Sequence, residues 1–356
     1  MSTLVDVEHG TTLPATLIVV RDLTITFPTA AGDRAAVYKL DVDIRRGEIL
    51  GIVGESGSGK STLALSLLNA VTTPGRIAGG SITIAGDSDI TTWSGEKLRH
   101  YRGARVGYVF QASQNSMNPL KRIGRQLLDL GRSHGVSDLR RLLAEAHRLC
   151  DRMGLDGARV LDSYQHELSG GMRQRVGIIF ALVLNAEVLI LDEPTTALDM
   201  LSQVSVLEIV KEIHAERDLA TIIITHDLGV VAEMADRLAV MYGGRLVELG
   251  PTQEIIRRPK HPYTAALMRA IPRIEGDPDL AQPLEGRPPD LASAPTQGCV
   301  FRDRCPRAEE SCMTDDPPLL PYAGREIACP VVMRPGIEAV GGLADHLDPG
   351  ATDQGR

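Results

Sequence analysis

The sequence lacks any apolar run close to the roughly 20 residues that a membrane-spanning helix needs. Its first residues also lack the basic segment followed by an apolar stretch that marks a secretory signal. The net charge is −8, which argues against non-specific binding to nucleic acid. We therefore expect a protein that is made and kept in the cytoplasm and that has no nucleic-acid partner.

Cysteine is scarce and unevenly placed. The 356 residues include five cysteines, and Cys150 stands alone in an apolar, helical setting that predicts a buried side chain. The other four fall within one short C-terminal stretch: Cys299, Cys305, Cys312 and Cys329. A reducing compartment argues against two disulfide bonds there and favours metal chemistry. Four thiolates suffice for zinc or for an iron–sulfur cluster, and the spacing lacks the C-x₂-C pair typical of structural zinc.

The clearest motif is the segment Gly54–Thr62, whose sequence GESGSGKST fits the phosphate-binding pattern G-x-x-x-x-G-K-[ST]. An apolar run at 49–53 predicts a buried strand before it, and 62–68 predicts a helix after it. Glycines let the loop bring its N–H groups onto phosphate oxygens, while Lys60 would reach the β- and γ-phosphates and Ser61 would hold Mg²⁺. The candidate binding residues are Ser56, Gly57, Ser58, Gly59, Lys60, Ser61 and Thr62.

The surrounding pattern predicts an α/β fold with a P-loop NTPase (RecA-like) core. Apolar or alternating runs at 17–27 and 36–44 predict an antiparallel β layer, and charged helical periodicity from about 123 to 153 predicts a helical insertion outside the core. Runs at 188–193 and 221–227 are apolar and end in polar residues, as buried parallel strands do at an active-site edge.

Composition divides the chain further, because prolines gather after about residue 271. We predict these parts: an N-terminal tail at 1–16, a nucleotide-binding domain at 17–271 with a helical subdomain at about 112–170, a proline-rich linker at 272–297, a small irregular cysteine-rich C-terminal module at 298–335, and a disordered tail at 336–356.

Several motifs then follow the P-loop in a fixed order. They are Gln111, Leu-Ser-Gly-Gly-Met at 168–172, Leu-Asp-Glu at 191–193, Ala-Leu-Asp at 197–199, and His226. Together they resemble the nucleotide-binding subunit of an ABC transporter over about residues 17–255. Narrower features at 118–120 and 261–264 and the late cysteines resemble the ATPase subunits of oligopeptide/dipeptide importers, which extends the resemblance to about residue 330.

The resemblance implies a role for each matched residue, with ATP and Mg²⁺ as the bound groups. Asp192 would hold the Mg²⁺ shell with Ser61, and Glu193 would polarise the attacking water. His226 would contact the γ-phosphate, and Gln111 would touch Mg²⁺ or the water and report to the membrane subunits. Phe27, at the end of the first strand, is the candidate for stacking on adenine; plain core packing is the alternative.

The resemblance also implies an assembly. Ser169, Gly170 and Gly171 begin a helix whose N-terminus can bind an anion, and in this family it faces the ATP held by a partner's P-loop. Asp199 would lie across the same interface. The expected partners are a second, homologous ATPase chain in a heterodimer, two transmembrane permease subunits and, indirectly, a peptide-binding protein. The expected place is the cytoplasmic face of the membrane, as a peripheral subunit.

Alternatives remain for the metal, the cargo and the class of protein. The importer branch implies a [4Fe–4S] cluster on the four late cysteines, with zinc as the alternative. The cargo could also be a nickel chelate or glutathione. The rival class is a soluble ABC-type ATPase that acts on DNA or ribosomes; such proteins usually carry two modules or a long coiled coil, whereas this chain shows one module and no heptads.

Overall fold

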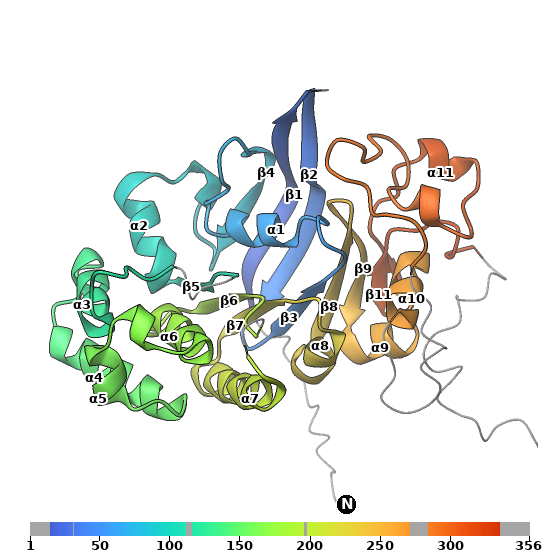
Figure 1. Ribbon diagram of the computed structural model, residues 1–356. Helices are drawn as coiled ribbons and strands as arrows, with labels where there is room; N and C mark the ends of the chain where they lie inside the picture. Colours follow the sequence, from blue (N-terminus) through green and yellow to red (C-terminus); the bar gives the residue numbers. More distant parts are fainter. Residues whose placement is uncertain (1–14, 31, 112–115, 196–197, 271–283, 335–356) are drawn as a thin grey trace, which may run out of the picture.

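The structure is a computed structural model that describes residues 15–30, 32–111, 116–195, 198–270 and 284–334 (Figure 1). The predicted tail at 336–356, nearly all of the tail at 1–16 and about half of the linker at 272–297 lie outside these ranges. Within them, no helix combines the length and the apolar character needed to cross a membrane.

The predicted antiparallel β layer is a three-stranded sheet in the order β2-β1-β4. Its strands are β1 (Thr16–Thr29), β2 (Gly32–Arg45) and β4 (Arg76–Ile84). The first hairpin extends further than the apolar pattern predicts, because the pairing continues through polar residues up to Thr29 opposite Gly32. The inner side chains of this layer, such as Ile18 and Ile82, are fully buried against the nucleotide core.

The second sheet has eight strands in the order β10-β11-β9-β8-β3-β7-β6-β5. The stretch from β8 to β5 is parallel, and β9, β11 and β10 continue it by antiparallel pairing. The bounds are β3 (Ile49–Val53), β5 (Val106–Val109), β6 (Val188–Asp192), β7 (Ala220–Ile224), β8 (Arg237–Tyr242), β9 (Arg245–Pro251), β10 (Leu320–Tyr322) and β11 (Arg325–Ile327). Strands β3, β6 and β7 are buried at every position, as continuous apolar runs predict.

Helices cover this sheet and form a lobe at one side, where α3, α4 and α5 pack together at the far end of the molecule from α11 (Figure 1). This lobe is the predicted helical insertion, and Cys150 is buried inside it as expected. The α-helices are α1 (Lys60–Ser66), α2 (Gly95–Ala104), α3 (Ile123–Ser133), α4 (Leu139–Arg152), α5 (Gly157–Asp162), α6 (Gly170–Leu182), α7 (Met200–Arg217), α8 (Leu228–Met234), α9 (Thr252–Arg257), α10 (Pro262–Arg269) and α11 (Ser311–Thr314). Short 3₁₀ helices are η1 (Ile90–Thr92), η3 (Gln165–Glu167) and η5 (Arg302–Arg304).

The C-terminal cysteine-rich segment is joined to the main sheet. The sequence predicts it to be irregular, but β11 pairs with β9 and carries β10 on its outer side. Arg325 of β11 donates to the fully buried Glu248 of β9 at 3.0 Å, and Glu248 also accepts from the backbone N–H groups of Lys260 and His261. Three-residue strands show too little alternation to be recognised from sequence.

His261 provides a test of this packing. It is buried at the N-cap of α10, where its ring accepts from the backbone N–H of Tyr263 at 3.1 Å, and burial lowers the pKa of His261 to about 3. An unfolded histidine titrates near 6.5, so the unfolded state binds the extra proton as the pH falls below that value. The stability should therefore be full above about pH 6.5 and decline towards pH 3.

We predict that His261→Asn, which keeps a capping side chain, removes this acid sensitivity. Between pH 6 and 4 the unfolding free energy of the wild type should fall more steeply than that of the variant, by about 1.4 kcal/mol per pH unit. Denaturant unfolding at several pH values measures both slopes. Parallel slopes would show that His261 is not held neutral by burial.

Candidate nucleotide-binding and catalytic site

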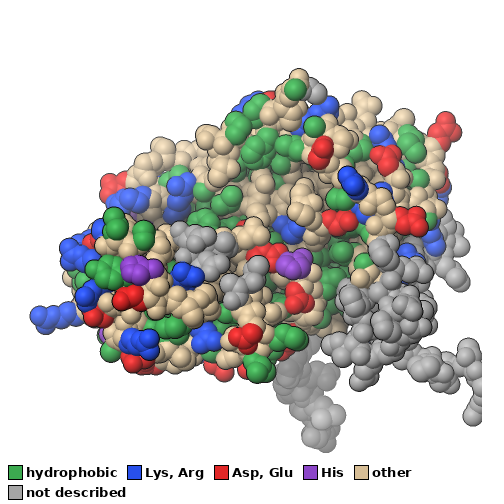
Figure 2. All heavy atoms as spheres, in the orientation of Figure 1, with side chains coloured by type: hydrophobic (Ala, Val, Ile, Leu, Met, Phe, Trp, Pro, Cys, Tyr) green, Lys and Arg blue, Asp and Glu red, His purple; other side chains and the backbone are tan. Residues whose placement is uncertain are grey.

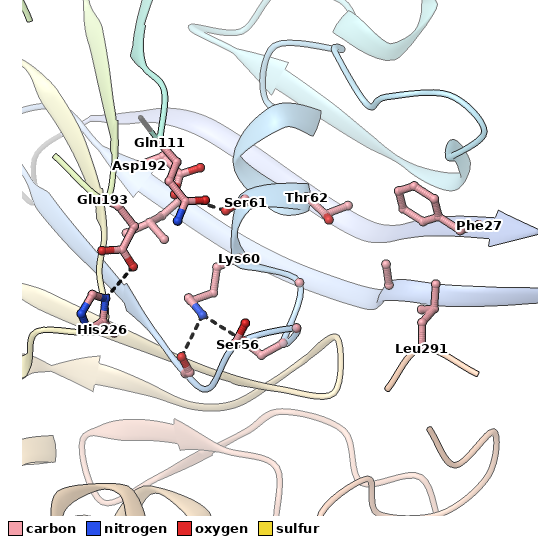
Figure 3. A pocket seen from close by; sticks show the side chains of 16 residues that line it. Phe27, Ser56, Lys60, Ser61, Thr62, Gln111, Asp192, Glu193, His226 and Leu291 are labelled. Carbon is pink, nitrogen blue, oxygen red and sulfur yellow. Dashed lines mark hydrogen bonds and ion pairs between the residues drawn. The ribbon is translucent and has the colours of Figure 1, made fainter. Parts of the chain in front are cut away.

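A cleft of about 510 Å³ opens where three neighbouring parallel strands end. The P-loop follows β3, Asp192 ends β6 with Glu193 directly after it, and His226 follows β7. The parallel pairing therefore brings their side chains to one edge of the sheet (Figure 3). The lining includes all seven predicted P-loop residues, Ser56 to Thr62, together with Gln111 and Phe27. The structure therefore gathers most of the predicted site residues into one cleft.

The P-loop is held in a shape that only glycine permits at two points. Gly54 has φ +153°, and a Cβ there would lie 2.1 Å from the carbonyl oxygen of Met241. Gly59 has φ +97°, and a Cβ there would lie 2.3 Å from the carbonyl oxygen of Ala36. The motif glycines thus let the loop pass close to its neighbours as well as to a ligand.

Lys60 supplies the positive charge of the cleft. Its Nζ donates to the carbonyl oxygens of Gly54 and Glu55 at 2.8 and 2.9 Å. Burial lowers the pKa of Lys60, whereas the nearby carboxylates of Glu193 and Asp192 act in the opposite direction. The Lys60 ammonium therefore lies against the P-loop backbone. A bound phosphate could replace these carbonyl oxygens as its hydrogen-bond acceptor.

Asp192 is a buried carboxylate, only 3% exposed, at the tip of β6. It accepts from the Ser61 hydroxyl at 3.2 Å and from the Tyr108 hydroxyl at 2.9 Å. Burial raises the pKa of Asp192, against the opposing effect of these two hydrogen bonds. A buried carboxylate beside a hydroxyl is an oxygen donor set that suits Mg²⁺, so the predicted pair of ligands fits that ion.

Tyr108 was missed by the sequence analysis. It lies on β5, where its hydroxyl reaches across to Asp192 on the paired strand β6. The one available signal was a polar group within the otherwise apolar run 106–110.

Glu193 and His226 meet at the mouth of the cleft. The His226 ring nitrogen Nδ1 lies 2.9 Å from a Glu193 carboxylate oxygen, and the two side chains are 75% and 12% exposed (Figure 3). Glu193 has φ +52°, a left-handed backbone that is uncommon for glutamate, and its N–H donates to the carbonyl oxygen of Ile224. Strained residues of this kind gather at functional sites, and a carboxylate so enclosed can accept a proton from a water molecule.

Phe27 lines the opposite end of the cleft from Glu193, beyond Thr62 (Figure 3). Its ring also covers Gly75, where a Cβ would lie 2.5 Å from the ring. Its position is compatible with both predicted roles, stacking on adenine and plain core packing, and the choice between them stays a prediction. Leu291 from the C-terminal part of the chain lines the same end, which the sequence gave no reason to expect.

The structure does not bring the second predicted anion site into this cleft. Ser169 is exposed and caps α6 by accepting from the N–H of Met172 at 3.2 Å, with Gly170 and Gly171 beginning the helix. Asp199 is exposed and caps α7 by accepting from the N–H of Ser202 at 2.9 Å. Within one chain these residues act as helix caps, at a distance from the P-loop cleft.

The four late cysteines lie near one another. Burial raises the pKa of the Cys299 thiol, and the neighbouring thiols of Cys329 and Cys312 raise it further. Burial likewise raises the pKa of Cys305 to about 11, with the other three thiols contributing. Across the described ranges, however, no three histidine, cysteine or carboxylate side chains are placed closely enough to hold a metal ion.

Comparison with known proteins places this arrangement in a family. Residues 37–196 match the family described as ABC transporter, and residues 247–312 match the one described as oligopeptide/dipeptide transporter, C-terminal region. The oligopeptide transport ATP-binding protein OppD of Salmonella typhimurium is 42% identical over 88% of this chain and 93% of its own length. The Escherichia coli protein of the same name is 41% identical over 88% and 92%. A putative peptide import ATP-binding protein of Brucella melitensis is 41% identical over 84% and 92%.

The chain belongs to the ABC transporter ATPase family. Solved structures agree with this ABC ATPase in fold. The dimeric ABC transporter cassette MJ0796 has a TM-score of 0.58 at 24% identity, over 66% of this chain and 99% of that one. CbiO1 of Clostridium perfringens has a TM-score of 0.57 at 27% identity, over 67% and 90%. The predicted P-loop fold and the predicted ATPase activity are thereby confirmed.

A substitution at Phe27 separates stacking from packing in this ABC ATPase. We predict that Phe27→Ala weakens ATP binding about 10-fold, within the 1–3 kcal/mol typical of base stacking on an aromatic ring. Tripolyphosphate, which has no base, should bind equally to both proteins. Calorimetric titration of each ligand measures the four affinities.

The Phe27→Leu variant is the matched control, because it keeps apolar volume over Gly75 and removes the aromatic face. If Phe27→Ala weakened both ligands equally, its role would be to shape the loop and not to bind the base.

Proposed function

We propose that this ABC ATPase powers the uptake of oligopeptides or dipeptides across the cytoplasmic membrane. The observation that carries the proposal is the match to the oligopeptide/dipeptide transporter C-terminal region at 247–312, beyond the end of the ABC transporter match at 196. The relatives that extend over most of the chain bear peptide-transport names. The proposed division keeps a nucleotide-binding domain at 17–271 and a cysteine-rich module at 298–335.

Hydrolysis is assigned to the carboxylate end of the cleft. Glu193 acts as the general base on the attacking water, and His226 fixes the carboxylate through their 2.9 Å contact and reaches the γ-phosphate. Ser61 and Asp192 hold Mg²⁺, which neutralises charge on the phosphates when it is bound. Gln111 lines the same cleft, where it would contact Mg²⁺ or the attacking water and transmit the presence of the γ-phosphate to the membrane subunits.

ATP is proposed to join two ATPase chains. Ser169, Gly170 and Gly171 offer a helix N-terminus that the chain's own cleft does not use, and α6 has the length to sustain a dipole. A partner's bound ATP would complete that site, with Asp199 alongside. The partner is a homologous ATPase chain, as the likeness to peptide-importer ATPases implies.

The membrane partners are two permease subunits that bind near the segment after Gln111. Leu120 is 85% exposed there, and Phe110 is 46% exposed on the other side of Gln111. Exposed apolar side chains on both sides of Gln111 in the sequence suit contact with a helix from a membrane subunit. The chain would then sit peripherally on the cytoplasmic face, with a peptide-binding protein acting indirectly from the other side.

Nucleic acid is not proposed as a partner. On the face shown in Figure 2, basic and acidic side chains are interspersed, and the net charge is −8. A protein that binds the negatively charged phosphate backbone of a nucleic acid would present a continuous basic surface.

The cysteine-rich module is proposed to hold a [4Fe–4S] cluster, with zinc as the alternative. The four thiols are near enough to affect one another's charge; burial raises the pKa of Cys329, and Arg307 acts in the opposite direction. A zinc ion at about 2.3 Å from each sulfur draws its ligands closer together than a four-iron cluster does. Among the described residues no three such side chains are close enough to hold a metal ion, so the proposal of a cluster rests on the resemblance to the importer ATPases.

Uptake measured in vesicles tests the function. We predict that Glu193→Gln in this chain leaves ATP binding intact and lowers both ATPase activity and peptide uptake by at least 10²-fold, the effect expected from loss of a general base. The complex should be purified through a tag on this chain, so that the co-purified permease and ATPase subunits are identified. Wild-type rates in the variant would contradict the catalytic assignment, and co-purification with nucleic acid and no membrane protein would support the rival class.

Metal analysis tests the module. Protein purified without oxygen should contain about four iron atoms and absorb visible light, and Cys312→Ser should lose both. Cys150→Ser is the control, because Cys150 is buried in α4 far from the module. Stoichiometric zinc without iron would support the zinc alternative. Protein that contained neither metal would overturn the proposal of a metal site.

A further inference from the structure

The side chain of Arg304 in the C-terminal module reaches the P-loop. Its Nη1 lies 2.6 Å from one carboxylate oxygen of Glu55, and its Nη2 lies 3.1 Å from the other. The two charges thus form the paired contact that suits a guanidinium and a carboxylate. The Arg304 side chain is 6% exposed and that of Glu55 is 23% exposed, so solvent screens the pair only weakly.

Other contacts fix the guanidinium in place. Arg304 donates to the Tyr242 hydroxyl at 3.1 Å and to the carbonyl oxygen of Glu285 at 2.8 Å. Behind them the rings of Tyr242, Tyr263 and Phe301 pack with centroids 4.5 to 5.4 Å apart, joining the end of β8, α10 and the C-terminal module. Arg304 is therefore positioned by the core and the module together.

Glu55 is part of the loop on which the phosphates are expected to bind. Its carbonyl oxygen accepts from Lys60 at 2.9 Å, and its N–H donates to the Tyr263 hydroxyl at 2.9 Å. Its carboxylate is also close enough to act on the charge of Lys60. An unpaired carboxylate at this position would compete with phosphate for Lys60 and would repel the anion.

We propose that Arg304 is a positioning residue for nucleotide binding: it neutralises and holds Glu55, so that the C-terminal module sets the affinity of the P-loop for ATP. The inference rests on the proposed use of this cleft for ATP. It adds a contribution from beyond the nucleotide-binding domain, made by the residue next to Cys305.

A double-mutant cycle on the full-length chain tests the charge mechanism. The probe is a non-hydrolysable ATP analogue with Mg²⁺, titrated by calorimetry. We expect Arg304→Gln to raise the Kd about 10-fold, because one weakly screened charge would then face the phosphates. In the Glu55→Gln background, Arg304→Gln should change the Kd less than about twofold, since no carboxylate is left to neutralise.

Two further variants separate charge from general damage. Arg304→Lys keeps the charge and should stay closer to the wild-type Kd than Arg304→Gln does. Arg334→Gln removes an ion pair with Glu309 inside the same module, away from the P-loop, and should leave the Kd unchanged.

An unchanged Kd in Arg304→Gln would overturn the inference. So would an equal loss of affinity in both Glu55 backgrounds, which would indicate a mechanical brace instead of charge neutralisation. If Arg304→Gln did not fold, the same cycle would be made with Arg304→Lys: its smaller rise in Kd should vanish in the Glu55→Gln background, and a rise of equal size in both backgrounds would overturn the inference. A wild-type chain that bound no nucleotide would instead refute the function proposed for the cleft.

Discussion

Charge balance around the P-loop is the constraint on which this site depends. A triphosphate brings several negative charges into a cleft that already holds the carboxylates of Asp192 and Glu193, with Glu55 behind the loop. Burial raises the pKa of Asp192, and the neighbouring carboxylate of Glu193 raises it further. Three groups on the cleft side of the P-loop can offset this negative charge: Lys60, the backbone N–H groups of the loop, and a divalent cation held by Ser61 and Asp192. Arg304 offsets it from behind.

The parallel sheet explains which residues meet and which do not. Side chains that follow β3, β6 and β7 meet because the strands are adjacent and point the same way. The helix that begins after Ser169 starts beyond the helical lobe, and its N-terminus lies outside the cleft. A second chain can bring such a helix N-terminus to a bound phosphate without any rearrangement. Within one chain, α6 would have to move towards the cleft, and this would break its packing on β5.

Sequence reasoning succeeded where the signal is local. The P-loop, the buried strands with polar tips and the helix start at Ser169 all depend on residues within one short window, so their pattern was readable. The roles of Tyr108 and Leu291, the contact of Arg304 with Glu55, and the strands β10 and β11 were missed for the opposite reason. The contact between Glu55 and Arg304 joins residues 249 positions apart, and no periodicity in either segment encodes it. The functional roles of the site residues remain predictions.

The contacts that attach the C-terminal module to the core indicate that the module affects nucleotide binding as well as its own stability. It is joined to the sheet by the buried pair of Arg325 and Glu248, and to the P-loop by Arg304. If the position of Arg304 raises the affinity for nucleotide, linkage requires that bound nucleotide stabilise that position by the same free energy. Any change in the cysteine-rich module that shifts Arg304 therefore shifts ATP binding, and ATP binding resists that change. The segment after the ABC domain is then part of the energetics of the ATPase.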